Sequence, residues 1–308
     1  MSSILVVGSV ALDTVETPFG RADEIVGGAA VYFGAAAALF GQVQVVGVVG
    51  GDYPLESLEF LRRRGVDLRG LEVHEGRSFR WGGAYSYDMN ARETLFTELG
   101  VFAEFRPTLP DPFRSTEWIF LGNIDPRLQL RVLDQVDSPR FVACDTMNYW
   151  IEKEREALLE VLGRIDMLVV NDAEARELSG DPNLARAARW IQDQGPTHVA
   201  IKKGEHGAVL LSGDGIFFAP GYPLEEILDP TGAGDAFAGG LMGHLAWADS
   251  VDPETMRRAV VYGCSLGSFA CEAFGPSRLA EVSALEVEER VATFQRMTRF
   301  ETAAVVES

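Results

Sequence analysis

The sequence predicts an α/β fold with a doubly wound, mainly parallel sheet flanked by helices. Short apolar runs, such as Ile4 to Gly8 and Val43 to Val49, recur along the chain and have the length and composition of buried parallel strands. Helical patterns separate many of these runs, as at Val31 to Phe40. Alternation of this kind is typical of a parallel sheet that carries helices on both faces.

The remaining elements follow from the same two patterns. Further strands are predicted at Trp118–Leu121, Phe141–Cys144, Met167–Val170, Val199–Lys202 and Ala208–Leu211. Further helices are predicted at Leu55–Arg63, Ile151–Leu162, Leu184–Gln194, Ala236–Ala248, Pro253–Ala273 and Leu285–Arg299. No repeat, low-complexity tract or long linker divides the chain. We therefore expect residues 1–308 to form a single domain.

Two segments, about 14–23 and 77–98, do not fit the alternation. In the second, Phe79-Arg80-Trp81 and Tyr85-Ser86-Tyr87 flank Gly82-Gly83, and Asp88-Met89-Asn90 marks another turn. This pattern predicts antiparallel strands, and an ordinary surface hairpin is one interpretation. Because the aromatic residues stand at alternate positions, one face is apolar and needs a ligand or a second subunit to cover it.

The composition predicts a globular protein: of 308 residues, 47% are hydrophobic and 24% are charged. A formal charge of −19 argues against binding nucleic acid or an anionic membrane through a general basic surface. Cys144, Cys264 and Cys271 lack CxxC spacing and lie in apolar surroundings, which indicates buried free thiols in a reducing compartment. No signal-peptide pattern or membrane-spanning run is recognised. These features predict a cytoplasmic protein.

The most informative segment runs from Asp229 to Gly240, where Gly232, Ala233 and Gly234 precede an apolar helical pattern. The glycines allow several backbone N–H groups to converge, and the helix adds the positive end of its dipole, so the corner can hold an anion. Asp235 falls in the first turn, where a carboxylate can take the proton of an attacking hydroxyl. The segment predicts a phosphoryl-transfer site, although a Gly-rich helix start with an acidic first turn is the simpler alternative.

The segment closely resembles the C-terminal signature of the ribokinase-like (phosphofructokinase B) family of sugar and nucleoside kinases. Other motifs of that family occur in the family's order along nearly the whole chain. The resemblance implies that Asp235 is the catalytic base and that Gly232, Ala233 and Gly234 form the anion hole. It also implies that the segments 14–23 and 77–98 form a β-sheet lid over the substrate, often shared across a homodimer.

On the acceptor side, the resemblance assigns Asp13 to the substrate hydroxyls, since an ionised carboxylate offers two acceptor oxygens. A turn aspartate at a strand end is the alternative. Gly27 and Gly28 match the paired glycines that bring backbone close to the substrate. Tyr32 departs from the family pattern, because it stands where an Asn often binds substrate hydroxyls, and Ala11 replaces another polar residue. These departures leave open whether the acceptor is a sugar or a nucleoside.

On the nucleotide side, Asn171-Asp172-Ala173-Glu174 matches the family's Asn-x-x-Glu motif, in which Glu174 organises hydrated Mg²⁺, and a simple helix cap is the alternative. Lys202, Gly204 and Gly207 take the place of a phosphate-contacting Thr-x-Gly-x-x-Gly. Lys202 there is one of only three lysines. The resemblance also assigns Thr231, Phe274 and Gly275 to the nucleotide site; in many members the last two border adenine and a monovalent cation such as K⁺.

Other chemistries find little support. No Gly-Lys pair occurs, which excludes a Walker phosphate loop, and the four histidines show no metal spacing. We therefore expect an ATP- and Mg²⁺-dependent kinase acting on the hydroxymethyl-type alcohol of an uncharged sugar, with a nucleoside as the alternative. An uncharged acceptor is expected because Arg21 is the only basic residue between Gly8 and Gly41. A catalytically silent nucleotide- or sugar-binding regulator is the rival interpretation.

Overall fold

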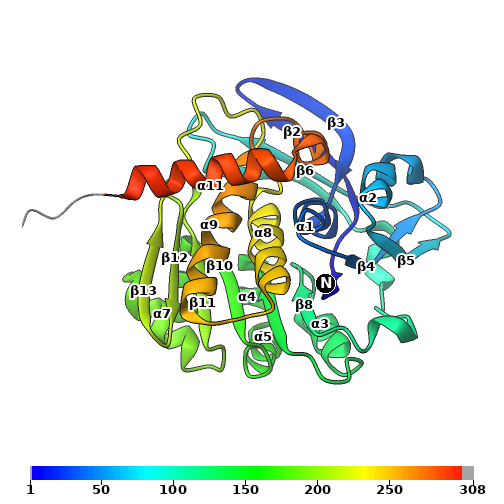
Figure 1. The fold of residues 1–308 in the computed structure, drawn as a ribbon. Helices are drawn as coiled ribbons and strands as arrows, with labels where there is room; N and C mark the ends of the chain where they lie inside the picture. The colour runs from blue at the N-terminus through cyan, green and yellow to red at the C-terminus, as the bar shows by residue number, and fades with distance from the viewer. Residues whose placement is uncertain (1, 300–308) are drawn as a thin grey trace, which may run out of the picture.

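A computed structural model describes residues 2–299 of the chain, which contain a large sheet and a small one (Figure 1). The large sheet has nine strands in the order β13-β12-β11-β10-β9-β8-β1-β4-β5. Its strands are β1 (Ile4–Val7), β4 (Val43–Gly50), β5 (Asp67–His74), β8 (Trp118–Leu121), β9 (Phe141–Asp145), β10 (Met167–Asn171), β11 (His198–Lys202), β12 (Ala208–Ser212) and β13 (Gly215–Ala219). In this order, every pair of neighbouring strands between β11 and β5 is parallel. Strand β12 pairs antiparallel with both β11 and β13.

The mainly parallel sheet confirms the predicted fold class. All seven strands expected from apolar runs are present, whereas the two edge strands β5 and β13 were not predicted. Both edge strands contain exposed and half-exposed positions, so neither shows the continuous apolar run of a strand that is covered on both faces.

Helices cover both faces of the large sheet (Figure 1). One face packs against the helices α1 (Ala29–Ala37), α2 (Glu59–Arg63), α8 (Ala233–Ala248), α9 (Pro253–Ala270), α10 (Ser277–Glu281) and α11 (Ala284–Thr298). The other packs against α3 (Pro126–Leu133), α4 (Asn148–Lys153), α5 (Arg155–Leu162), α6 (Asp172–Ser179) and α7 (Leu184–Gln192). Short 3₁₀ turns occupy Leu55–Leu58, Gly100–Glu104, Asp111–Phe113 and Gly204–His206.

Two predicted helices differ from the structure. The pattern from Ile151 to Leu162 forms two helices, α4 and α5, because the chain breaks at Glu154, whose φ is −127°. The pattern from Leu55 to Arg63 begins as a 3₁₀ turn and continues as α2. In both cases the apolar spacing continues across the break, so periodicity alone does not reveal it.

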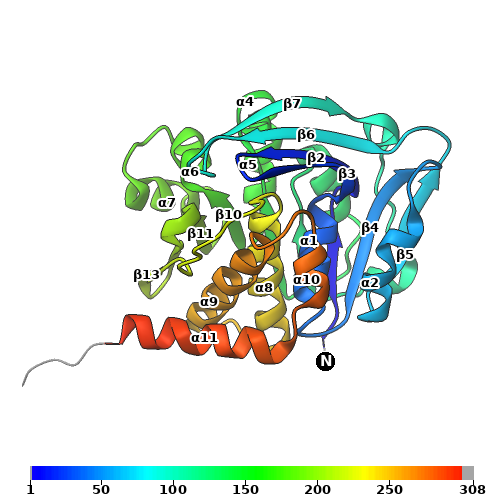
Figure 2. The ribbon, with the colours of Figure 1, turned by 90° about the horizontal axis from the view of Figure 1, so that it is seen from above.

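The small sheet contains β2 (Ala11–Thr17), β3 (Gly20–Gly27), β6 (Phe79–Tyr85) and β7 (Arg92–Glu98), in the order β3-β2-β6-β7. It lies along one side of the large sheet (Figure 2). The expectation of a small separate sheet is thus confirmed, with two corrections. Gly82-Gly83 is not a turn but lies within β6, and β2 pairs with β6 in parallel rather than antiparallel. We call this small sheet the lid.

No helix within residues 2–299 is both long and apolar enough to cross a membrane. The three cysteines are free, and two of them, Cys144 and Cys264, are buried. In the large sheet, the carboxyl ends of the parallel strands lie along one edge. In open α/β sheets this edge is the usual place for a ligand.

Candidate active site

A buried ion pair lies at the carboxyl edge of the large sheet. Asp145 ends β9 and Lys202 ends β11, with β10 between them. Lys202 Nζ lies 3.0 Å from Asp145 Oδ2, and the two side chains are 18% and 7% exposed. Although burial works in the opposite direction, the charges of Asp145 and Glu174 raise the pKa of Lys202. Lys202 is therefore a permanent cation of the site.

The predicted anion hole opens helix α8. Gly232 is the N-cap with a left-handed φ of 76°, and a Cβ there would lie 2.3 Å from the ring of Tyr32, so only glycine fits. Just before it, Asp229 is fully buried and accepts the N–H groups of Thr231 at 2.8 Å and Gly275 at 3.1 Å. Asp229 thereby fixes the loop that leads into the hole.

Asp235 lies in the first turn of α8, next to this loop. Burial and then the charge of Asp145 raise its pKa to about 7, while Lys202 and Arg92 act in the opposite direction. Lys202 Nζ lies 3.1 Å from the place where a Cβ on Gly234 would be, so the cation adjoins the anion hole. A carboxylate with a pKa near neutrality, beside backbone N–H groups that can hold a phosphate, suits general-base catalysis.

The carboxylate of Asp13 lies behind the paired glycines. A Cβ on Gly27 would come within 1.9 Å of Asp13 Oδ2, and Gly28, the N-cap of α1, has a φ of 95°. Burial, followed by the charge of Asp229, raises the pKa of Asp13 to about 7, and Asp235 also contributes. The structure thus brings together the two carboxylates to which the sequence assigned acceptor binding and base catalysis.

The two aromatic residues at the start of α1 differ in their surroundings. Tyr32 is buried, and its hydroxyl has no hydrogen-bond partner among residues 2–299. After burial, the charges of Asp13 and Asp229 are the main causes that raise its pKa. Phe33, in contrast, stacks on Phe120 in the core with ring centroids 4.5 Å apart. Phe33 therefore offers no surface to a ligand, because core packing covers its ring.

Asn171 and Glu174 form a reciprocal capping box at the start of α6. Asn171 Oδ1 accepts from the Glu174 N–H at 2.8 Å, and Glu174 Oε2 accepts from the Asn171 N–H at 2.7 Å. The cap does not exclude a second role, since burial raises the pKa of Glu174 to about 7 and the charges of Lys202 and Asp145 act on it. Glu174 is thus both a helix cap and a member of the acidic site.

The lid contacts the loops of the site at its β6–β7 end. Thr231 Oγ1 donates a hydrogen bond to the Tyr85 hydroxyl at 3.1 Å. Asn90 lies against Gly204, because a Cβ on Gly204 would be 2.3 Å from Asn90 Oδ1. Gly204 and Gly207 have φ values of 56° and 84°. Figure 2 shows this end of the lid directed towards α6.

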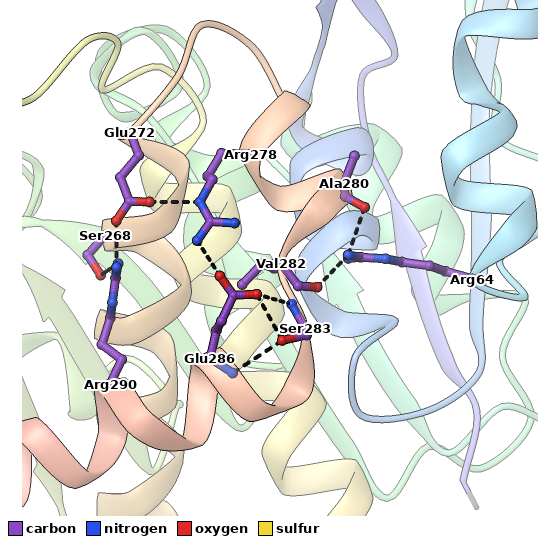
Figure 3. Close-up of polar contacts among 9 residues, drawn as sticks. All are labelled: Arg64, Ser268, Glu272, Arg278, Ala280, Val282, Ser283, Glu286 and Arg290. Carbon is purple, nitrogen blue, oxygen red and sulfur yellow. Dashed lines mark hydrogen bonds and ion pairs between the residues drawn. The ribbon is translucent and has the colours of Figure 1, made fainter.

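The segment with Phe274 and Gly275 joins the lid to the anion-hole loop. Phe274 lies 3.3 Å from the place of a Cβ on Gly20 of β3, and Gly275 donates to Asp229. Behind it, Glu272 pairs with Arg278 and Arg290, and Arg290 also donates to Ser268 (Figure 3). This network links α9, α10 and α11 and fixes the segment from behind. Its place near the nucleotide stays a prediction.

Comparison with known proteins decides the family. The model of the pfkB family carbohydrate kinases matches residues 1–282. The chain belongs to this family. It is similar to the cytidine kinase of Thermococcus kodakarensis, with 32% identity over 79% of this chain and 88% of that protein. It is also similar to the aminoimidazole riboside kinase of Salmonella typhimurium, with 26% identity over 96% of this chain and 95% of that protein.

Solved structures of pfkB-type kinases share the fold. The aminoimidazole riboside kinase from Salmonella enterica, complexed with its riboside and an ATP analogue, gives a TM-score of 0.75 at 21% identity over 94% of this chain and 100% of that chain. The nucleoside kinase of Burkholderia thailandensis, in complex with inosine, gives a TM-score of 0.77 at 21% identity over 94% of this chain and 97% of that chain. The expectations of a kinase and of the ribokinase-like fold are confirmed.

The donor set of this pfkB-family site fits Mg²⁺. Residues 2–299 contain no preformed cluster of three or more His, Cys, Asp or Glu that could hold a metal. Glu174, however, is a half-buried carboxylate whose pKa is raised by burial and by the charge of Asp145, although the charge of Lys202 acts in the opposite direction. Mg²⁺ prefers oxygen ligands, keeps several waters and is commonly held by few carboxylates together with nucleotide phosphates. A single carboxylate acting through water is sufficient for such a site.

Three residues that contact or face the site were missed by the sequence analysis. Asp145 carries the same signal as Asn171, a polar residue directly after a buried strand, and could have been found from it. Tyr85 was assigned to the lid but not to the anion-hole loop. Arg92, whose charge acts on Asp13 and Asp235, has no local signal, because only the docking of the lid brings it there.

Proposed function

We propose that this kinase transfers the γ-phosphate of ATP, with Mg²⁺, to the primary alcohol of an uncharged nucleoside. The sequence favoured a plain sugar first and a nucleoside second. The names of the relatives support the reverse order, since those that match most of the chain include a cytidine kinase, an aminoimidazole riboside kinase and a nucleoside kinase. A plain sugar remains the second candidate, because sugar kinases match over part of the chain.

The observation that carries the proposal is the position of Asp235 in the first turn of α8, directly after the left-handed Gly232 N-cap and with Lys202 beside Gly234. Asp13 is buried beside Gly27, where its two oxygens can accept hydroxyl groups of the acceptor. Asp235 takes the proton of the attacking alcohol. The alcohol oxygen forms a bond to the γ-phosphorus while the bond to the β-phosphate oxygen breaks and ADP leaves.

The nucleotide is assigned to the opposite side of the anion hole. The N–H groups of Gly232, Ala233 and Gly234 receive the transferred phosphate, and Thr231, Lys202, Gly204 and Gly207 line the adjoining loops. Asn171, Phe274 and Gly275 complete the proposed nucleotide site. When bound, Mg²⁺ supplies positive charge to the phosphates, and Glu174 would hold it through water. A monovalent cation such as K⁺ beside Phe274 and Gly275 is part of the same proposal.

The lining of the acceptor side favours an uncharged ligand with a flat ring. Trp81 and Tyr85 lie on one face of β6, and Tyr85 points to the anion-hole loop. The unpartnered Tyr32 hydroxyl lies among the acidic groups and can bond to an acceptor. Between Gly8 and Gly41 the only basic residue is Arg21, which pairs with Glu16 and Asp23, so this segment offers no free cation to a phosphorylated sugar. The arrangement suits a nucleoside better than a sugar phosphate.

The proposal includes a cytoplasmic location, suggested by the free thiols, and a homodimer formed through the lid. Residues 1–308 are proposed to act as one domain with the lid inserted in it.

A comparison of kcat/KM across cytidine, inosine, adenosine, ribose, fructose and fructose 6-phosphate tests the acceptor. We expect a nucleoside to be preferred over every free sugar. A thermal-shift screen of the same compounds, with a non-hydrolysable ATP analogue present, provides an activity-independent reading. Preference for ribose or fructose would move the assignment to a sugar kinase, and preference for fructose 6-phosphate would refute an uncharged acceptor. If the protein turns over ATP with none of these compounds, the interpretation as a catalytically silent regulator is favoured.

A further inference from the structure

The site holds more negative than positive charge. Five carboxylates surround it, from Asp13, Asp145, Glu174, Asp229 and Asp235, and burial raises the pKa of four of them. Lys202 is the single basic residue on the strand ends that form the site, and its ammonium is engaged by Asp145 at 3.0 Å. A nucleotide triphosphate adds further negative charge. Bringing it into this site without more positive charge is strongly unfavourable.

Arg92 is placed to supply such charge. It begins β7 and pairs in register with Tyr85 of β6, so the two side chains share one face of the lid. The guanidinium carbon of Arg92 lies 5.1 Å from the ring centroid of Trp81, on that same face. Since the Tyr85 hydroxyl bonds to Thr231, the end of the lid that carries Arg92 is held against the anion-hole loop.

Arg92 forms no ion pair with any carboxylate in the part of the chain that the structure describes. Within residues 2–299 Arg92 has no acidic partner within 4.0 Å, and the residue is solvent-exposed, so a ligand can reach it. Its charge nevertheless lowers the pKa values of Asp13 on β2 of the lid, and of Glu174 on α6 and Asp235 on α8 of the main body. Other arginines of the lid differ, because Arg21, Arg77 and Arg80 pair with acidic residues.

We propose that Arg92 is a catalytic residue that binds the γ-phosphate of the nucleotide from the lid. This inference rests on the proposed function for the phosphate donor but not for the acceptor. The guanidinium presents paired N–H donors to two phosphate oxygens and stays protonated throughout. It stabilises the charge that spreads over the transferring phosphoryl group, while Asp235 alone takes the proton.

The test compares the β,γ-imido analogue of ATP with ADP, because only the first carries a γ-phosphate. With Mg²⁺ present and no acceptor, calorimetry should show that Arg92→Gln weakens binding of the analogue about tenfold, the scale of one charge-assisted hydrogen bond, while ADP binding is unchanged. With the best acceptor of the panel, kcat should fall about 10²-fold or more. Arg92→Lys should restore part of both, because lysine keeps the charge without the paired donors.

Arg77→Gln is the matched control, since Arg77 lies just before the neighbouring lid strand β6, is exposed and pairs with Glu98 of β7. It should leave both affinities and kcat unchanged. Equal weakening of analogue and ADP by Arg92→Gln would overturn the proposal, and so would a loss confined to the KM of the acceptor. If no acceptor of the panel were phosphorylated but the analogue alone were weakened, the acceptor assignment would fail while the role of Arg92 would stand.

Discussion

Lys202 and Asp145 form an ion pair of 3.0 Å across the intervening strand β10, next to the first turn of α8. The two partners act on the pKa of Asp235 in opposite directions, because the charge of Asp145 raises it and the charge of Lys202 lowers it. Removing either partner leaves a mostly buried charge without compensation. The pair therefore tunes the proposed base as well as stabilising the strand ends.

The first prediction concerns the pH dependence of the reaction. Because Asp235 must be deprotonated to act and its pKa is raised to about 7, kcat/KM should fall as the pH drops below about 7. Asp145→Asn removes a negative charge and frees Lys202, and both changes lower the pKa of Asp235. The acid limb should then move to lower pH, whatever the height of the profile. A limb that stays in place, or moves up, would contradict this assignment; Asp111→Asn, at an exposed site, is the control.

The second prediction is that Asp235→Asn lowers kcat by about 10²–10⁴-fold, the usual scale for a lost general base. ATP affinity should change little, because the anion hole is made of backbone. Coupled detection of ADP release measures the rate, and calorimetry measures ATP binding. Turnover close to that of the wild type would remove Asp235 from the mechanism.

The same variant should be more stable than the wild type at high pH, which is the third prediction. The pKa of Asp235 is higher in the folded state, about 7, than its ordinary value of 3.8. The favourable contribution of the Asp235 carboxyl group to folding stability is therefore present at pH values below its ordinary pKa. It is lost as the pH rises through the pKa of the folded state. Melting curves should show a gain of about 1–3 kcal/mol for Asp235→Asn at pH 8 and almost none at pH 4. An equal gain at both pH values would point to packing instead.

The fourth prediction separates the two roles of Glu174. Glu174→Gln keeps an oxygen that can accept from the Asn171 N–H, so the capping box survives while the negative charge is lost. The variant should need more Mg²⁺ for half-maximal rate but should melt close to the wild-type temperature. Glu177→Gln, one turn later on α6, is the control. An unchanged Mg²⁺ titration would take Glu174 out of the proposed metal site.

The sequence predicts the parts of this protein whose signals are local. The buried strands appear as apolar runs, and the anion-hole loop appears because Gly232 needs a left-handed φ directly before a helix. The lid is only partly predictable. The glycines at 82 and 83 read as a turn, yet they lie within β6, where the Phe96 and Trp81 rings leave no room for a Cβ.

Contacts between distant segments are what the sequence does not reveal. Lys202 and Asp145 are far apart along the chain, and their pairing depends on the order of the strands. The hydrogen bond between Tyr85 and Thr231 depends on how the lid docks. Phe33 and Tyr32 are neighbours with similar buried rings, and only the packing of α1 shows that Phe33 stacks on Phe120 whereas the Tyr32 ring lies against Gly232.

The last prediction is that the protein forms a dimer through the lid, although not through the face first expected. Phe79 stacks on Phe102 at 5.3 Å, and Tyr85 bonds to Thr231, so the chain itself covers these two side chains. Other large apolar side chains of the lid remain exposed: Phe19, Tyr87, Leu95 and Phe96.

These exposed side chains lie on the β2–β3 and β6–β7 turns and on the edge strand β7, where they are an association liability unless a second subunit covers them. Light scattering should show a dimer at micromolar concentration, and Leu95→Lys together with Tyr87→Ser should shift it towards the monomer. Glu93→Lys, on the same strand, is the charge control. A monomer for the wild type at all micromolar concentrations, without ligand, would rule out dimerisation through the lid but would leave its role in covering the acceptor intact.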